Sequence, residues 1–273
     1  MGTRRQRLSE VRERYRDDAL QRGFNPRDVD LLLSDILGKP LSFLIAHGDE
    51  KIDPALLAAL LKRRFAGEPL QYIRGKTEFF SREFYVDDRV LIPRPETEVL
   101  VETALARAPR NGRVIDIGTG SGCIAISIER TRPDLQVTGV DVSLAALAVA
   151  DRNRRALDSR VRLAGSDLLA SVHGEFDLIV SNPPYVGDEE LAQLEPEVRL
   201  YEPRLALTSG PRGTEIIERI LDQVSRGTLL MEVGYGQEGA IRALAKEKRF
   251  KVEAFVNDLA GIPRVVVLSR PHG

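Results

Sequence analysis

The chain of 273 residues contains one cysteine, no tryptophan and three histidines. The single Cys123 excludes an internal disulfide and a metal site built from cysteines. His47, His173 and His272 have no clustered ligand partners in the sequence, so no metal is expected. No apolar run reaches the roughly 18 residues that a membrane span needs, and residues 1–16 contain no apolar stretch typical of a signal peptide. These absences favour a reducing cytosol and no membrane contact.

The sequence also has no excess of charge of one sign. Forty Lys and Arg residues oppose 41 Asp and Glu residues, for a formal net charge of −1. This balance argues against a protein whose main role is non-specific binding to nucleic acid or to an anionic membrane. The N-terminal segment is locally basic through Arg4, Arg5, Arg7, Arg12, Arg14 and Arg16. Because Glu10 and Glu13 are interleaved with these arginines, a solvated helix face is favoured over a phosphate-binding surface.

The length, at roughly 150 residues per domain, predicts two domains or one large domain with an appendage. The first third of the chain has the pattern of short helices. Residues 8–21 form a charged helix that ends before Gly23. Asn25-Pro26 and Asp53-Pro54 each place a capping side chain before a proline that can begin a helix, and leucine-rich segments follow both. Residues 1–75 are therefore predicted to form a small helical bundle.

The pattern changes after residue 76. Aromatic and β-branched residues between Thr77 and Ile92 predict a β-hairpin, which makes residues 76–92 a linker. From Pro93 onward strand and helix patterns alternate, which predicts an α/β fold with a parallel sheet covered by helices on both faces. The last two strands, at 251–258 and 263–270, are joined by only four residues, so we expect them to be antiparallel. Residues 93–273 are predicted to be this second domain.

A glycine-rich turn at 116–122, with the sequence DIGTGSG, follows the first strand of the second domain. Its glycines allow a sharp turn and bring a ligand close to the amides at the start of the next helix. Cys123 stands where a dinucleotide fingerprint would need its third glycine. Asp141 ends the next strand, where a carboxylate can accept hydrogen bonds from both hydroxyls of a ribose. A tight turn without a ligand is the alternative, and the position of Asp141 weakens it.

Two further segments follow later strands. Asp167 and Leu168 could receive an adenine, although a helix-capping Asp followed by core leucines explains them equally well. Asn182-Pro183-Pro184-Tyr185 follows the strand at 176–181. The prolines fix the backbone and remove two amide donors, so an Asn oxygen and a main-chain carbonyl can form a receptor for a planar NH2 group, with Tyr185 as a stacking surface. A simple turn is the alternative.

DIGTGSG, Asp141 and NPPY, in this order, resemble class I S-adenosylmethionine-dependent methyltransferases that act on an amide or exocyclic nitrogen. Further stretches closely resemble the protein-glutamine methyltransferases of peptide-chain release factors, the PrmC/HemK family. They are GEPLQYIRGKTEFF (67–80), LIPRPETEVLVE (91–102), YEPRLALTSGPRGTEII (201–217), MEVGYGQ (231–237) and NDLAGIPRVV (257–266). The resemblance covers about residues 20 to 268. NPPY alone is shared by many methyltransferases, whereas GEPLQYI followed by IPRPETE is much more specific.

The resemblance implies a class I (Rossmann-like) methyltransferase sheet with an N-terminal helical substrate-recognition domain. It implies methyl transfer from S-adenosyl-L-methionine to the side-chain amide nitrogen of a glutamine in class 1 release factors. By position, the cofactor would contact Gly118, Thr119, Gly120, Ser121, Gly122, Asp141, Asp167, Leu168 and Asn182. Asn182, Pro183, Pro184 and Tyr185 would hold the substrate glutamine and form the catalytic set. Leu168 departs from relatives that offer an aromatic there.

Two charged residues lie within or near these motifs. Arg94, in IPRPETE, would lie close to the cofactor, or else be a surface residue paired with Glu96 or Glu98. Glu202, in YEP, is interpreted as a buried ion-pair partner with no catalytic part.

Two rival functions stay open on the sequence. A nucleic-acid methyltransferase would present the same planar NH2 group of adenine or guanine to NPPY. The near-zero net charge and the absence of a large reading module argue against direct nucleic-acid binding. A cofactor-binding adaptor without catalysis would leave the intact NPPY unexplained.

Overall fold

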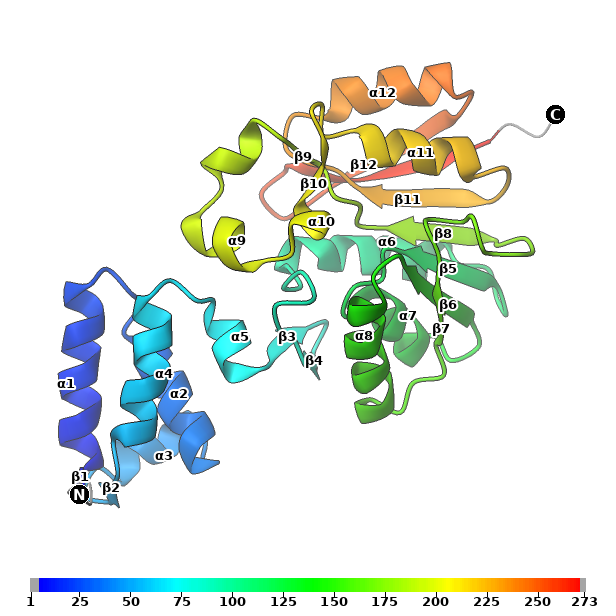
Figure 1. The fold of residues 1–273 in the computed structure, drawn as a ribbon. Coiled ribbons are helices and arrows are strands. Elements are labelled where there is room, and N and C mark those ends of the chain that lie inside the picture. Colours follow the sequence, from blue (N-terminus) through cyan, green and yellow to red (C-terminus); the bar gives the residue numbers. More distant parts are fainter. Residues whose placement is uncertain (1–4, 271–273) are drawn as a thin grey trace. The chain divides into compact units, whose positions relative to one another are not determined.

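The computed structural model describes residues 5–270, which form two compact units (Figure 1). The first unit extends to Gly75 and also contains Pro196–Tyr201. The second unit comprises Lys76–Glu195 and the chain from Glu202 onward. Each unit has an apolar core of its own.

The first unit is a bundle of short helices. They are α1 (Leu8–Gln21), α2 (Arg27–Leu37), α3 (Leu41–Ala46), α4 (Ala55–Phe65) and α5 (Leu70–Arg74), with one antiparallel contact between β1 (Gln6–Arg7) and β2 (Lys51–Ile52). Asn25 Oδ1 accepts a hydrogen bond from the amide of Arg27, and Asp53 Oδ1 accepts one from Ala55, both at 2.9 Å. The two predicted helix caps are therefore confirmed. Helices α3 and α5, each of six residues or fewer, were not predicted from the sequence pattern.

Arginines of the first unit pair with half-buried or buried acids. Arg12 and Arg16 both bind the carboxylate of Asp30 on α2, which is 8% exposed. Arg64 binds Asp28 at 2.8 Å and Glu197 at 2.7 Å. Glu197 belongs to α9 (Pro196–Tyr201), a later segment that packs with this unit. Arg12 and Arg16 are thus partly covered and paired within the bundle, so for these two residues the interpretation of a solvated helix face is wrong. Arg4 lies outside the described residues.

The second unit contains a seven-stranded sheet with the order β12-β13-β11-β8-β5-β6-β7. The strands are β5 (Arg113–Ile117), β6 (Gln136–Asp141), β7 (Arg162–Gly165), β8 (Leu178–Ser181), β11 (Thr228–Glu232), β12 (Lys251–Asn257) and β13 (Pro263–Ser269). Strands β11, β8, β5, β6 and β7 are parallel neighbours. β13 is antiparallel to both β11 and β12. The predicted α/β fold with an antiparallel C-terminal strand pair is confirmed.

Helices cover both faces of this sheet (Figure 1). The apolar residues of α6 (Glu98–Arg107) and α7 (Cys123–Thr131) share one core with alternate residues of β5, β8 and β13. The opposite residues of those strands pack against α11 (Glu215–Gln223) and α12 (Glu238–Glu247). The sequence analysis did not anticipate α6, whose apolar residues follow directly on the proline-rich segment. None of the helices within residues 5–270 has the length and apolar character needed to cross a membrane.

The predicted hairpin is shorter than expected. It consists of β3 (Thr77–Phe79) and β4 (Arg82–Phe84), paired in register from Thr77 opposite Phe84 to Phe79 opposite Arg82. The turn residues Phe80 and Ser81 both have positive φ, at 48° and 58°, as a two-residue hairpin turn demands. After Phe84 the chain forms no strand up to the 3-10 turn at Pro95–Thr97 that precedes α6. Part of this extended segment borders the site described below.

Candidate active site

The site lies at the carboxyl ends of the parallel strands, where β5 has β6 on one side and β8 on the other. Ile117, the last residue of β5, is paired with Ser181, the last residue of β8. The Ser181 hydroxyl donates a hydrogen bond to the Ile117 carbonyl at 2.8 Å. In open α/β sheets ligands bind in the crevice where the strand order reverses in this way. The glycine-rich turn and the NPPY segment therefore begin next to each other.

A cavity of about 350 Å³ opens at this point in the second unit. It is bordered by most of the residues singled out in the sequence, namely Gly118, Thr119, Gly120, Ser121, Asp141, Asp167, Leu168, Asn182 and Pro184. Gly122, Pro183 and Tyr185 are not among its lining residues. Segments that are distant in sequence thus converge on one cavity, and three predicted residues lie behind its wall.

The glycine-rich turn is held by Asp141. Asp141 Oδ2 accepts a hydrogen bond from the Gly120 amide, and Oδ1 accepts one from Ser143, both at 2.9 Å. Each carboxylate oxygen can accept a second hydrogen bond, so the carboxylate can still receive ligand hydroxyls. Burial raises the pKa of Asp141, and the backbone hydrogen bonds from Ser143 and Gly120 oppose that rise.

Gly122 acts from behind the cavity wall. It precedes α7 with φ at 81°, and a Cβ there would lie 2.9 Å from Ile126 Cδ1 and 3.3 Å from Ala150 Cβ. A side chain would therefore clash with α7 and with α8 (Leu144–Ala156). This glycine allows close packing of the helices behind the turn.

Asp116 lies buried beneath the glycine-rich turn. Its side chain is fully inaccessible, Oδ2 accepts a hydrogen bond from the Thr119 hydroxyl at 2.7 Å, and Oδ1 has no hydrogen-bond partner. Burial raises the pKa of Asp116 to about 7. An unpartnered carboxyl oxygen at this depth is costly, so Asp116 lowers the free energy of unfolding of the protein.

Asp167 and Leu168 border the cavity from the segment that follows β7. The Asp167 carboxylate forms an ion pair of 2.6 Å with Arg219, and about half of its side chain remains exposed. Leu168 has a φ of 53°, in the left-handed region. No helix begins after Asp167, so the helix-capping alternative is wrong. Leu168 and Leu169 do pack against the apolar core, and Leu168 also borders the cavity.

The NPPY segment presents its residues in different directions. Asn182 Nδ2 donates to the Thr97 hydroxyl at 3.2 Å, and Asn182 borders the cavity. The Tyr185 hydroxyl donates to Glu232 Oε1 at 3.3 Å, and the Tyr185 carbonyl accepts a hydrogen bond from Gln237 Nε2 at 2.9 Å. Burial raises the pKa of Tyr185. The tyrosine is fastened at both its hydroxyl and its carbonyl, behind the residues that face the cavity.

A second strand pair supports NPPY from the far side. β9 (Val186–Gly187) runs parallel to β10 (Thr208–Gly210). A Cβ on Gly213, whose φ is 71°, would lie 2.5 Å from the Tyr185 carbonyl oxygen, so only glycine allows this approach.

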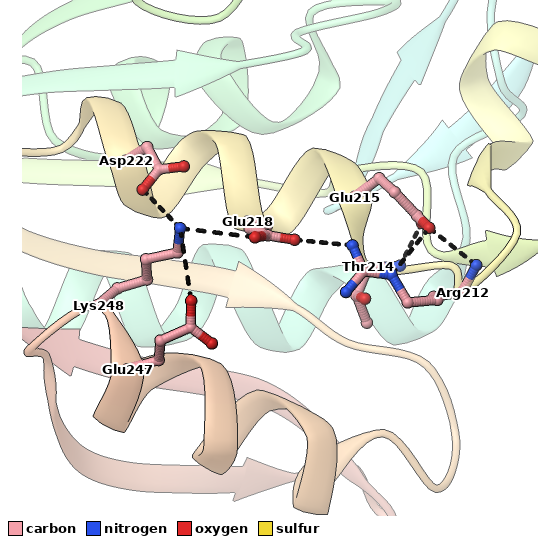
Figure 2. Close-up of polar contacts among 7 residues, drawn as sticks. All are labelled: Arg212, Thr214, Glu215, Glu218, Asp222, Glu247 and Lys248. Atoms are coloured by element: carbon pink, nitrogen blue, oxygen red, sulfur yellow. Dashed lines mark hydrogen bonds and ion pairs between the residues drawn. The ribbon is translucent and has the colours of Figure 1, made fainter.

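Ion pairs along α11 anchor the loop that carries Gly213, as Figure 2 shows. Arg212 contacts Glu215 at 3.2 Å and Glu218 at 2.8 Å. Lys248, at the end of α12, contacts Asp222 at 2.8 Å and Glu218 at 3.5 Å. Because the Arg212 and Thr214 amides also donate to Glu215, this loop is held at both its side chains and its backbone.

Arginines on the cavity wall are paired with acids. Arg94 binds Glu202, which is 5% exposed and also accepts a hydrogen bond from the Ile92 amide at 3.1 Å. The interpretation of Glu202 as a buried ion-pair partner is confirmed, and the pairing of Arg94 with Glu96 or Glu98 is wrong. Arg89 pairs with Asp87 in the same way. These pairs leave the wall without an uncompensated arginine for a phosphate group.

Several residues of the site were not singled out from the sequence. Asn153 on α8 is 1% exposed, donates to the carbonyls of Tyr85 and Ser121, and accepts from the Tyr85 amide. It fastens the glycine-rich turn to the extended segment after β4. Thr97 lies within IPRPETE and Glu232 within MEVGYGQ. The resemblance of these stretches to the family could have drawn attention to both residues, but it did not indicate their roles.

A metal site is not evident in the described part of the chain. No group of three or more His, Cys, Asp or Glu residues within residues 5–270 has the arrangement to hold a metal ion. His272 lies outside these residues.

Comparisons with known proteins agree with this geometry. Residues 9–75 match the family described as PrmC N-terminal domain, and residues 95–199 match Methyltransferase small domain. A release factor glutamine methyltransferase from Koribacter versatilis is 41% identical over 261 residues, which are 90% of this chain and 92% of that protein. One from Neisseria gonorrhoeae is 44% identical, covering 83% of this chain and 86% of that protein. The chain belongs to the release factor glutamine methyltransferase family.

The fold has a solved counterpart in a methyltransferase from Pyrococcus furiosus. That structure has a TM-score of 0.54 and 17% sequence identity, and the match covers 80% of this chain and all of the other. At this identity the likeness concerns the fold.

Members of this methyltransferase family use S-adenosyl-L-methionine as methyl donor, and the cavity fits it. Gly118 and Gly120 have no Cβ atom and leave open space along the turn. Asp141 keeps acceptor capacity for ribose hydroxyls. Asp141 and Asp167 border the cavity with carboxyl groups, and carboxylates stabilise a ligand that carries a positively charged sulfur.

Replacing Asp141 tests the ribose assignment. We expect Asp141→Ala to weaken binding of S-adenosyl-L-methionine by about 1–3 kcal/mol, because it removes hydrogen bonds to a charged acceptor and frees the Gly120 amide. Isothermal titration calorimetry measures the change. Asp151→Ala on α8, where the acid pairs with Arg154 and Arg155, is the matched control and should bind normally. Unchanged affinity in Asp141→Ala would contradict the assignment.

The buried Asp116 predicts a pH dependence of stability. Its folded-state pKa of about 7 lies above the ordinary aspartate value of 3.8, so the folded state holds its proton more tightly than the unfolded state. Its stabilising contribution is complete below pH 4 and is lost as the pH rises through 7. We expect Asp116→Asn to remove this loss, which amounts to up to about 4 kcal/mol.

Urea unfolding followed by circular dichroism at pH 5 and pH 8 tests this expectation. Glu175→Gln, which neutralises an exposed acid paired with Arg226, is the control and should keep the parental difference between the two pH values. An equal pH dependence in Asp116→Asn and the parent would show that Asp116 is not the group responsible.

Proposed function

We propose that this protein transfers the methyl group of S-adenosyl-L-methionine to the side-chain amide nitrogen of a glutamine in class 1 peptide-chain release factors. The observation that carries the proposal is the position of Asn182. Its Nδ2 is held by Thr97 while the residue borders the cavity next to the glycine-rich turn. Its Oδ1 is thereby available to accept a hydrogen bond from a substrate NH2 group.

An amide nitrogen is a poor nucleophile because its lone pair is delocalised into the carbonyl group. Asn182 Oδ1 and a main-chain carbonyl of the Asn-Pro-Pro segment accept hydrogen bonds from the two substrate N–H groups. These bonds localise the lone pair on nitrogen and stabilise the positive charge that develops there. The prolines fix the carbonyls in place, so positioning contributes much of the remaining rate enhancement.

The cofactor, when bound, supplies an electrophilic methyl group on a sulfonium. Asp141 would orient the ribose, Asp167 and Leu168 would receive the adenine, and residues 118–121 would form the backbone cradle for the methionine part, with Gly122 supporting it from behind. No strong base is required, because the N-methylated amide cation is very acidic and loses its proton readily. The placement of Tyr185 behind the cavity wall, bonded to Glu232, makes it a support of the NPPY turn in addition to any stacking on the substrate.

We assign substrate recognition to residues 1–75, methyl transfer to residues 93–273, and the linker role to residues 76–92. All cofactor-lining residues belong to the second unit, which leaves the helical unit free for the protein substrate. A role in translation termination implies a cytosolic location.

Incubation with labelled S-adenosyl-L-methionine and either a class 1 release factor or double-stranded DNA tests the function directly. We expect label in the release factor at a single glutamine, identified by mass spectrometry, and none in DNA. Label in DNA instead would favour methylation of an exocyclic base amine. Absence of label in both, with cofactor bound, would favour a non-catalytic adaptor.

Asn182→Ala separates a catalytic role from a simple turn. We expect the single-turnover methylation rate with saturating cofactor to fall roughly 10²-fold or more, as for loss of one positioned polar group in an active site. Cofactor affinity should change little, because the glycine-rich turn and Asp141 are its main anchors. If the variant binds cofactor and methylates at the parental rate, NPPY is only a turn.

A fragment that begins at Thr77 tests the division of labour. We expect it to bind the cofactor normally, since it retains the whole cavity and both cores of the second unit. Methylation of a release factor should fall strongly through an increase in KM. Cofactor binding measured by calorimetry establishes that the fragment is folded, and full activity in that folded fragment would refute the assignment of residues 1–75.

A further inference from the structure

A chain of polar side chains connects the two ends of the NPPY segment, from Asn182 and Thr97 at the cavity to Tyr185 and Glu232, which do not line it. Asn182 Nδ2 donates to Thr97 Oγ1 at 3.2 Å. The Tyr185 hydroxyl donates to Glu232 Oε1 at 3.3 Å. Thr97 and Glu232 are each 2% exposed, and the Thr97 hydroxyl is close enough to the Glu232 carboxyl to lower its pKa against the larger rise that burial causes.

Neither Thr97 nor Glu232 is explained by an ordinary structural role. Thr97 stands at the N-cap of α6, where a threonine usually bonds to a helix amide, but its side chain makes no such bond. Glu232 ends β11, and its Oε2 has no hydrogen-bond partner. A buried carboxyl group with an unpartnered oxygen costs folding free energy, so its presence calls for an explanation.

The donor and acceptor directions of these contacts point to a role for Thr97 and Glu232. When Glu232 is ionised, its carboxylate only accepts hydrogen bonds. The Tyr185 hydroxyl then donates to it, and the nearby Thr97 hydroxyl is drawn to point its hydrogen the same way. The Thr97 oxygen then has only lone pairs to offer Asn182, and the amide must turn its Nδ2 toward Thr97. Asn182 Oδ1 is consequently left facing the cavity as an acceptor.

We propose that Glu232 and Thr97 are positioning residues that set the amide orientation of Asn182 and thereby the acceptor for the substrate NH2 group. This inference rests on the proposed function of Asn182. It extends that function to Thr97, which borders the cavity, and to Glu232, which is not among the lining residues. A glutamine at position 232 offers a donor as well as an acceptor. The Thr97 hydroxyl can then turn its hydrogen to Asn182 Oδ1, and the amide loses its fixed orientation.

Single-turnover methylation of a class 1 release factor by the full chain, with saturating cofactor, tests the proposal. We expect Glu232→Gln and Thr97→Val each to lower the rate by about tenfold, the lower end of losses from second-layer positioning groups. Thr97→Ser, which keeps the hydroxyl, should recover most of that loss. Thr103→Val is the matched control, because Thr103 is a buried threonine of α6 that bonds only to the Val99 carbonyl.

A double-mutant cycle distinguishes positioning from a general structural effect. If Thr97 and Glu232 act through Asn182, neither substitution lowers the rate further in an Asn182→Ala background. Additive losses, or parental rates in both single variants, would overturn the proposal.

The side-chain amide signal of Asn182 in a nitrogen-15 NMR spectrum gives a readout that is independent of activity. The signal is assigned by its absence in Asn182→Ala. We expect it to shift in Glu232→Gln and Thr97→Val and to stay in place in Thr103→Val. If the parent fails to methylate a release factor, the proposed function fails, while the NMR signal still decides the hydrogen-bond arrangement. An unchanged signal in Glu232→Gln and Thr97→Val rejects that arrangement.

Discussion

The pairing of β5 with β8 is the constraint on which the site depends. The two strands are distant in sequence, yet their last residues, Ile117 and Ser181, lie opposite each other and are joined by a hydrogen bond of 2.8 Å. The glycine-rich turn leaves one strand and NPPY leaves the other. A shift of register by one residue would turn Ser181 away and separate the two turns. Buried apolar residues on both faces of the two strands, Val114 and Ile115 on β5 and Leu178 and Ile179 on β8, secure the register.

The residues of the site fall into two groups, those that border the cavity and those that support them from behind. Asn182 and Pro184 border the cavity, while Pro183 and Tyr185 lie behind them. Gly122 and Gly213 do not line the cavity either, and each permits a close approach of backbone that a Cβ would block. Rigid support of this kind is what a site needs when its catalysis depends on holding a weak nucleophile in place.

Charge around the cavity favours a cationic ligand over a phosphate. Its lining arginines are paired with carboxylates, Arg89 with Asp87, Arg94 with Glu202 and Arg219 with Asp167. Asp141 and the buried Asp116 remain without an ion-pair partner among the described contacts, and burial raises the pKa of both. A cationic ligand in the cavity would favour the ionised form of Asp141, which borders it.

Local patterns in the sequence determined the helix caps at Asn25 and Asp53, the alternation of strands and helices, the antiparallel end of the sheet and the positions of the glycine-rich and NPPY turns. Each depends on neighbouring residues, whose backbone preferences and apolar spacing are visible in one dimension. The tertiary structure decided which of these residues face the cavity, and it brought Arg94 to Glu202 and Thr97 between Asn182 and Glu232. Such contacts join residues 85 to 135 positions apart, and no local preference encodes them, because their energy comes from burial that exists only once the sheet has closed.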